Sequence, residues 1–196
     1  VLLTLLFYFF IIPDEGIFSI LLAVISSVST SGISIYSSNF DVSLFFILMT
    51  IIGGSLISTS SGFKYIRFYI LLKISYQEIY KLVKPINIFN RNLFHSDSQF
   101  DEQDTKIAFL VFISFIFAIF ILSSILALDT LSFENSFKLS ILTLTNTVAS
   151  SIYGMDNLMF FDMNSFTKMS LMIFMIFGKI EIIALLFLIK KFIFRE

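Results

Sequence analysis

The stretch IFSILLAVISSVSTSGIS, residues 17–34, joins a twelve-residue apolar run to a loop of hydroxyl residues with one glycine. A helix rises about 1.5 Å per residue, so residues 17–28 would cover about 18 Å of a hydrocarbon core about 30 Å thick. The run is therefore too short to cross a bilayer and is typical of a re-entrant helix. Because irregular backbone at membrane depth is tolerated only where protein buries it or water lines it, the loop predicts a pore or a cavity.

A second short apolar run, residues 137–144, also leads into a small polar loop, TNTVASS at residues 145–151. Thr30 and Asn146 take the same place in the two loops and are 116 positions apart. The chain is therefore predicted to contain an internal repeat, although few side chains are identical between the two copies.

Longer apolar runs flank the two short ones. The clearest is Ile107–Leu128, whose 22 residues carry no charge and would reach about 33 Å as a helix. The order span, short helix, loop, span then occurs twice, and two spans in each unit return the chain to the same side. The sequence predicts an all-α integral membrane protein built from parallel pore-loop repeats. The other runs are residues 1–12, interpreted as the end of a truncated span, residues 42–74, a helix interrupted at 53–62, and Met169–Ile189.

The composition excludes several classes of protein. Hydrophobic residues make up 57% of the chain, charged residues 14%, and the mean hydropathy is +0.95, which excludes a soluble monomer. A net charge of -1 provides no basic field for binding nucleic acid. With no cysteine and one histidine, His95, the chain lacks the residues for thiolate or histidine metal sites. We therefore expect neither an enzyme nor a nucleic-acid-binding protein.

The distribution of charge predicts the orientation in the membrane. Basic residues gather in two segments, and by the positive-inside rule both should be cytoplasmic. We expect a first repeat at residues 1–74, a cytoplasmic linker at 75–104, a second repeat at 105–196 and a cytoplasmic C-terminus. The opposite loops are acidic and would concentrate cations at an outer mouth. The basic residues are Lys64, Arg67, Lys73, Lys81, Lys84, Arg91 and Lys106 in the first segment, and Lys190, Lys191 and Arg195 in the second.

The two polar loops contain the candidate filter residues. Hydroxyl residues and glycine let successive carbonyls turn toward an axis, where they can replace the water shell of a monovalent cation. A polar turn between buried helices is the alternative for each loop, and two loops at equivalent positions favour the pore. The candidates are Ser29, Thr30, Ser31 and Gly32 in the first loop, and Asn146, Thr147, Val148 and Ala149 in the second.

The sequence GGSLISTSSG, residues 53–62, interrupts a helix in the middle of the membrane, where freed carbonyls need partners or water. We predict a gate here, with Lys179 of the last span facing it, because an ionisable group at that depth is costly and functional by default. Close helix packing through small residues is the alternative for the loop, and snorkelling is the alternative for the lysine. The candidate gate residues are Gly53, Gly54, Ser58, Thr59, Gly62 and Lys179.

In this order and at these spacings, the motifs resemble the C-terminal half, the third and fourth repeats, of the Trk/Ktr/HKT superfamily of potassium transporters, and most closely a TrkH-type membrane subunit. Ser29–Gly32 resembles a family filter loop, and Lys84-Pro85 resembles the His-Pro that follows the third repeat. Residues 53–67 follow the glycine-rich intramembrane loop and its basic exit. Residues 178–181, Gly-Lys-Ile-Glu, resemble the Gly-Arg-Leu-Glu of the last helix.

The resemblance implies inward passage of K⁺, with Na⁺ as an open possibility, through a pseudo-fourfold pore of four repeats in one chain. The K⁺ ligands would include the backbone carbonyls of Thr30, Ser31, Asn146 and Thr147. It further implies a multi-pass protein of the bacterial inner membrane, in contact with lipid, a homodimer, and a cytoplasmic nucleotide-binding regulatory subunit of the TrkA/KtrA type. No cofactor is expected in this chain. Only two repeats are present, so we expect a fragment of a longer protein.

Three departures from the family pattern bear on selectivity and gating. Ala149 stands where the fourth filter loop usually has glycine, and its Cβ would oppose a left-handed backbone. The gate loop has Ile57, Ser60 and Ser61 at frequent glycine positions, and Lys179 replaces arginine, losing a planar fork of donors. A non-selective monovalent cation pathway, a structural membrane protein and a membrane enzyme remain as alternatives.

Overall fold

The computed structural model describes residues 16–33, 42–52, 61–83, 102–129, 131–155, 160 and 163–179. Every regular element in these ranges is a helix, which confirms the predicted all-α class. The expected first span at 1–12, most of the interrupted segment, and the chain beyond Lys179 lie outside the described residues. The elements are α2 (Ile17–Val28), α3 (Ser43–Ile51), α4 (Tyr65–Val83), α5 (Glu102–Ala127), α6 (Phe133–Leu144), the 3₁₀ turn η2 (Ser151–Tyr153) and α7 (Ser165–Lys179).

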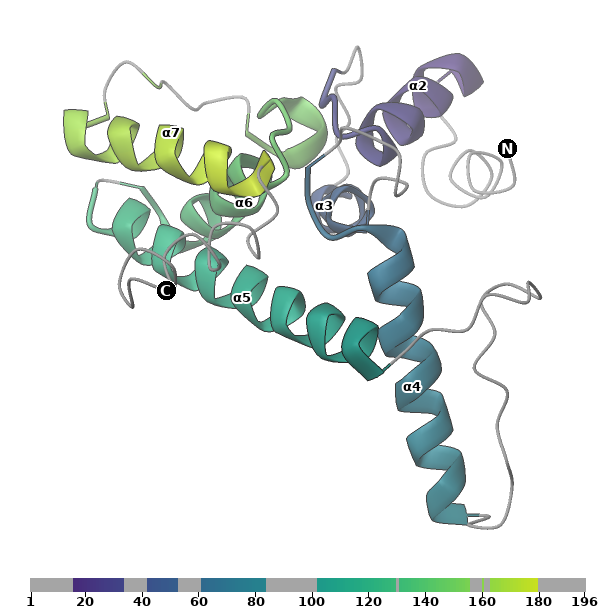
Figure 1. Ribbon diagram of the computed structural model, residues 1–196. Coiled ribbons are helices and arrows are strands. Elements are labelled where there is room, and N and C mark those ends of the chain that lie inside the picture. Colours follow the sequence, from purple (N-terminus) through teal and green to yellow (C-terminus); the bar gives the residue numbers. More distant parts are fainter. Residues whose placement is uncertain are drawn as a thin grey trace, which may run out of the picture.

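The two short helices and the long helix follow the lengths of the apolar runs. Helix α2 covers the predicted residues 17–28, and α6 begins at Phe133, four residues before its apolar run. The part of α5 from Gln103 to Ala127 is the helix within the described ranges that is long and apolar enough to cross a membrane. The α6 helix packs between α5 and α7, and α2 packs on α3 (Figure 1).

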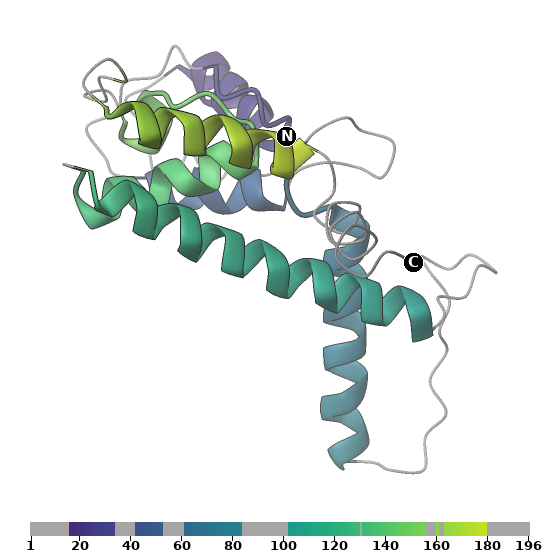
Figure 2. The same cartoon turned by 60° about the vertical axis from the view of Figure 1, so that its left-hand side comes forward.

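The structure describes the chain on both sides of the interruption predicted in the helix at 42–74. Helix α3 ends at Ile51, residues 61–64 are not helical, and α4 begins at Tyr65, while residues 53–60 lie outside the described residues. The second half differs from the expectation, because α4 runs to Val83 and so extends nine residues into the predicted linker. It leaves the rest of the molecule beyond its crossing with α5, where Ile70 packs on Ala108 (Figure 2).

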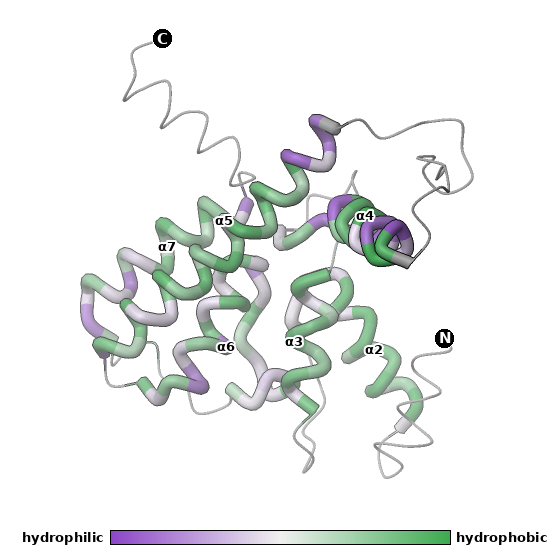
Figure 3. Tube along the Cα trace, turned by 90° about the horizontal axis from the view of Figure 1, so that it is seen from below, coloured by the Kyte–Doolittle hydropathy of each residue, from purple (hydrophilic) through white to green (hydrophobic). Residues whose placement is uncertain are grey.

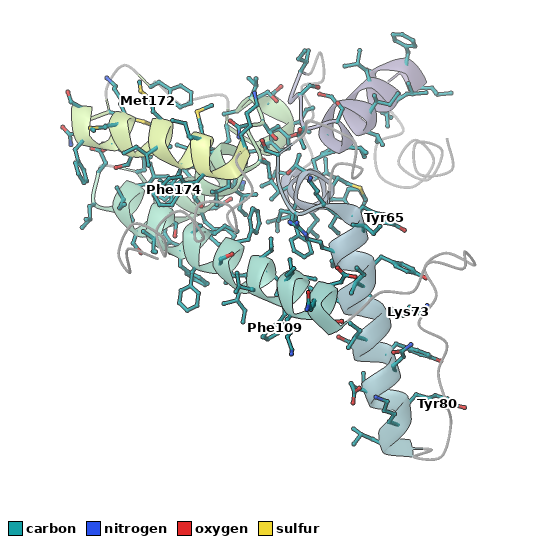
Figure 4. All side chains as sticks on the ribbon, in the orientation of Figure 1. Tyr65, Lys73, Tyr80, Phe109, Met172 and Phe174 are labelled. Atoms are coloured by element: carbon teal, nitrogen blue, oxygen red, sulfur yellow. The ribbon has the colours of Figure 1, made fainter. Side chains whose placement is uncertain are left out.

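Polar side chains on its surface explain why α4 extends beyond residue 74. Tyr65, Lys73 and Tyr80 point to the side of α4 away from α5 (Figure 4). Lys81 forms an ion pair with Glu78 one turn earlier, at 2.5 Å. Helix α4 is thus more polar than α5 and α7 (Figure 3), which suits a helix that continues out of an apolar layer.

Asp129, in the turn after α5, holds the start of α7. One of its carboxylate oxygens accepts hydrogen bonds from the Asn164 amide at 3.1 Å and the Thr167 hydroxyl at 2.7 Å, and the other accepts from Asn164 Nδ2 at 2.9 Å. A carboxylate at a helix N-terminus satisfies orphan N–H groups and opposes the helix dipole favourably. The cap ties the turn after α5 to the beginning of α7.

The hydrophobic core is shared by α2, α3, α5, α6, η2 and α7, and it includes residues of both predicted repeats. Ile20 of α2, Phe46 of α3, Leu142 of α6 and Tyr153 of η2 are almost fully buried in it. Phenylalanines on the outer face of α5, such as Phe117, are instead exposed. An apolar outer face of this kind suits a helix surrounded by lipid.

Candidate functional site

The two pore loops leave their helices with the same hydrogen bonds. Three successive amides in each loop donate to carbonyls of the preceding helix, and each bond in the second loop lies 116 positions after its counterpart in the first. The two short helices therefore end alike, each with the hydrogen bonds that commonly close a helix at a left-handed residue. The bonds are Ser29 to Ile25 at 2.9 Å, Thr30 to Ser27 at 3.2 Å and Ser31 to Ser26 at 3.0 Å, and then Thr145 to Ile141 at 2.9 Å, Asn146 to Thr143 at 3.1 Å and Thr147 to Leu142 at 2.9 Å.

Both loops turn at a residue with a left-handed backbone. The φ angle is 57° at Thr30 and 52° at Asn146, and these are the non-glycine residues with positive φ in the described part of the chain. Asparagine adopts this conformation readily, whereas a β-branched threonine is strained in it. Residues held in such regions cluster at functional sites, where the surrounding structure fixes them.

The loops meet at Gly32 and Val148. A Cβ on Gly32 would collide with the carbonyl oxygen of Val148 and would lie 2.7 Å from its nitrogen, so backbone touches backbone here. The φ of Gly32 is 72°, which also favours glycine. By the 116-residue register, Gly32 and Val148 are equivalent positions. When equivalent positions of two rotated units are in contact, both lie close to the rotation axis.

The register changes the interpretation of the second loop. Val148, with 60% of its surface exposed, takes the place equivalent to Gly32, and Ala149 follows one residue later. Ala149 does not have a positive φ. The Cβ of Ala149 therefore does not oppose a left-handed backbone, contrary to our expectation, and the residue in that conformation is Asn146.

Each loop also has a contact between two hydroxyl groups. Ser31 Oγ lies 3.0 Å from Ser26 Oγ, and Thr147 Oγ1 lies 2.9 Å from Thr145 Oγ1. In the described residues no hydrogen bond reaches the carbonyl oxygens of the four predicted ligands, which are Thr30, Ser31, Asn146 and Thr147.

The side chain of Asn146 connects three elements. Its Nδ2 donates to Ser61 Oγ and to the Met175 carbonyl, both at 2.9 Å. Ser61 closes the interrupted segment and Met175 belongs to α7. The sequence predicts Asn146 as a filter residue through its backbone, but no local pattern indicates which distant groups its side chain meets.

Of the predicted gate residues, Gly62 and Lys179 are described, while Gly53, Gly54, Ser58 and Thr59 lie outside the described residues. Gly62 has φ 97°, and a Cβ there would lie 3.3 Å from Thr145 Cγ2. Lys179 is exposed at the end of α7. The end of the interrupted segment, at residues 61 and 62, therefore packs directly against the second pore loop.

Gly178, next to Lys179, brings α7 against the second short helix. A Cβ on Gly178 would collide with the carbonyl oxygen of Leu144 and would lie 2.8 Å from its carbonyl carbon. Leu144 is the last residue of α6. Only a residue without a side chain permits this approach, so α7 fixes the end of α6 from which the second loop begins.

Lys138 of α6 is buried beside Gly154, the residue that follows η2. The Lys138 side chain is 6% exposed and pairs at 2.7 Å with Glu134, which is 70% exposed. Gly154, with φ 68°, lies against the ammonium group, since a Cβ there would be 3.4 Å from Lys138 Nζ, an ordinary contact. Lys138 belongs to the short apolar run at 137–144, and the structure buries its side chain.

The described fold is shared with a solved membrane transporter. No protein-family model and no curated protein matches the sequence. The crystal structure of the potassium transporter TrkH from Vibrio parahaemolyticus superposes with a TM-score of 0.78 and 22% sequence identity. The match covers 95% of this chain and 40% of the TrkH chain. The chain thus has a TrkH-like fold and spans about two fifths of that protein's length.

Proposed function

We propose that this chain forms two pore-loop units of a membrane subunit that moves K⁺ inward. The contact between Gly32 and Val148, equivalent residues of two loops with matching hydrogen bonds, supports the proposal most directly. In this proposal the contact would bring two sets of backbone carbonyls beside one axis, as a filter requires. The solved structure with this fold is named as a potassium transporter, and we extend that activity to this chain.

Backbone carbonyl oxygens would coordinate the cation. The carbonyls of Thr30, Ser31, Asn146 and Thr147 would replace water around a weakly hydrated monovalent cation. Two units supply part of a ring of ligands, and two further units of a longer protein would complete it. The 40% coverage of TrkH supports this division.

The remaining assignments follow the sequence. We place the repeats at 1–74 and 105–196 and the 75–104 linker on the cytoplasmic side of a bacterial inner membrane, where the basic residues gather. The segment 53–62 is the proposed gate, with Lys179 opposite. A homodimer and a cytoplasmic nucleotide-binding regulatory subunit complete the proposed assembly, as in the family that the sequence resembles.

A non-selective cation pathway is the second candidate, and Val148 favours it. A branched side chain stands where the first loop has glycine, so the two loops cannot present identical backbone to the ion. Relaxed geometry at one loop would reduce the discrimination between K⁺ and Na⁺.

Tracer uptake by the full-length protein in vesicles tests the proposal. We expect K⁺ uptake above Na⁺ uptake in the wild type, and loss of that preference in Gly32→Val with insertion unchanged. Equal uptake of both ions by the wild type would support the non-selective pathway. No uptake of either ion by correctly inserted wild type would overturn the proposal, and loss of insertion in Gly32→Val would support a packing role.

A further inference from the structure

We infer that Asn146 is a positioning residue whose side-chain amide fixes the second pore loop to the end of the interrupted segment and to α7, and that this attachment sets the ion preference. The inference rests on the proposed function, because it concerns the loop through which the ion would pass. It assigns Asn146 a role beyond its carbonyl and gives Ser61 a role in selectivity.

The attachment uses the whole donor capacity of the amide nitrogen. Nδ2 carries two hydrogens, and it has two acceptors at 2.9 Å, Ser61 Oγ and the Met175 carbonyl. A carbonyl oxygen can only accept, so the atom that faces Met175 must be the nitrogen. This fixes the orientation of the amide independently of how Ser61 directs its hydroxyl hydrogen.

The position of Asn146 makes the attachment effective. Asn146 is the left-handed residue at which the chain turns from α6 into the loop. A change in its backbone angles would swing the carbonyls of Asn146 and Thr147 together. Anchoring its side chain to α7 and to a buried serine opposes that change, because both hydrogen bonds would have to break or stretch.

A second contact supports the same connection. Gly62, next to Ser61, approaches Thr145 so closely that a Cβ would lie 3.3 Å from its Cγ2. Two successive residues of one segment therefore face two successive residues of the other. A displacement of residues 61 and 62 would be transmitted to the loop, and by linkage an ion that holds the loop would favour their present position.

The first loop lacks this device within the described residues. Thr30 is the equivalent of Asn146, yet its hydroxyl has no hydrogen-bond partner in the ranges that the structure describes. Within the described residues, the attachment acts on the second loop, which has Val148 in place of glycine. We expect the attachment to keep the backbone of the second loop in one conformation, because this loop has valine where the first has glycine.

The experiment uses the full-length protein in vesicles and measures the ratio of K⁺ to Na⁺ uptake. Ser61→Ala removes the acceptor and should lower the ratio by about two- to tenfold, the effect of one neutral hydrogen bond. Ser61→Thr keeps a hydroxyl and should restore most of the ratio. Ser170→Ala is the matched control, because Ser170 is also buried but bonds to the Phe166 carbonyl one turn before it in α7.

A double-mutant cycle separates positioning from packing. Asn146→Gly removes the amide but keeps a residue that tolerates positive φ. Ser61→Ala should lower the ratio in the wild type and have no further effect in Asn146→Gly. Additive effects, or a Ser61→Ala ratio equal to that of Ser170→Ala, would overturn the inference while wild-type K⁺ uptake persists. Absence of wild-type uptake would overturn the proposed function itself.

Discussion

Gly32 and Val148, equivalent residues of the two pore loops, touch through their backbones, and no side chain fits at Gly32 without moving one loop from the other. Backbone atoms of a neighbouring loop cannot rotate away as the end of a flexible side chain can. The spacing of the two loops is therefore set by the absence of a single methyl group.

Gly32→Ala should abolish selective K⁺ uptake even though it adds only one carbon. The substitution combines a collision with Val148 and a cost of about 1 kcal/mol for alanine at positive φ. Tracer uptake in vesicles measures the effect. Gly16→Ala is the control, because a Cβ there has its nearest neighbour, Ser19 Oγ, at 3.8 Å. Equal loss in both variants would contradict the prediction.

Val148→Gly should raise the ratio of K⁺ to Na⁺ uptake, because it gives the second loop the residue present at the equivalent position of the first. Ala149→Gly should leave the ratio nearly unchanged, since Ala149 does not have positive φ. The same uptake assay compares the two variants. A larger gain from Ala149→Gly would show that the 116-residue register is wrong.

Gly178→Ala should lower the thermal unfolding temperature of the detergent-solubilised protein. The added methyl group meets the Leu144 carbonyl, so α7 must move away from α6, at a cost of about 1–3 kcal/mol for overpacking. Met172→Ala on the exposed side of the same helix is the control (Figure 4). A stable Gly178→Ala protein would mean that the two helices separate easily.

Asp129→Ala should destabilise the protein by about 1–2 kcal/mol, because the N-terminus of α7 loses its carboxylate cap. Asp129→Asn keeps one oxygen acceptor and should cost less. Thermal unfolding of both variants provides the comparison. If the two variants unfold at the same temperature as the wild type, the cap contributes nothing measurable.

Loss of Glu134 should lower the free energy of unfolding more than loss of its partner Lys138. Glu134→Gln leaves a buried ammonium group without its counter-ion and should cost about 1–3 kcal/mol, whereas Lys138→Met leaves an exposed carboxylate in water and should cost less than about 1 kcal/mol. Urea or thermal unfolding measures both. A larger cost for Lys138→Met would indicate that the ammonium group has a structural role beyond the pair.

The local elements could be predicted because each depends on a short stretch of sequence. Residues 17–28 form a short helix because the apolar run has twelve residues, and the break after Ile51 follows from glycines and hydroxyl residues that favour irregular backbone. The sequence predicts that this helix ends at residue 74, whereas α4 ends at Val83. Its polar extension to Val83 is helical without being apolar, so hydropathy alone did not reveal it.

The sequence by itself determined the two short helices, their hydroxyl-rich loops and the 116-residue repeat, since run length and residue type act within one segment. The tertiary structure alone decided that Val148 rather than Ala149 meets Gly32, that Asn146 donates to Ser61 and Met175, and that Gly178 touches Leu144. These pairs join residues 29 to 116 positions apart. Their meeting depends on how whole helices pack, because no local preference encodes the partner of a side chain across that distance.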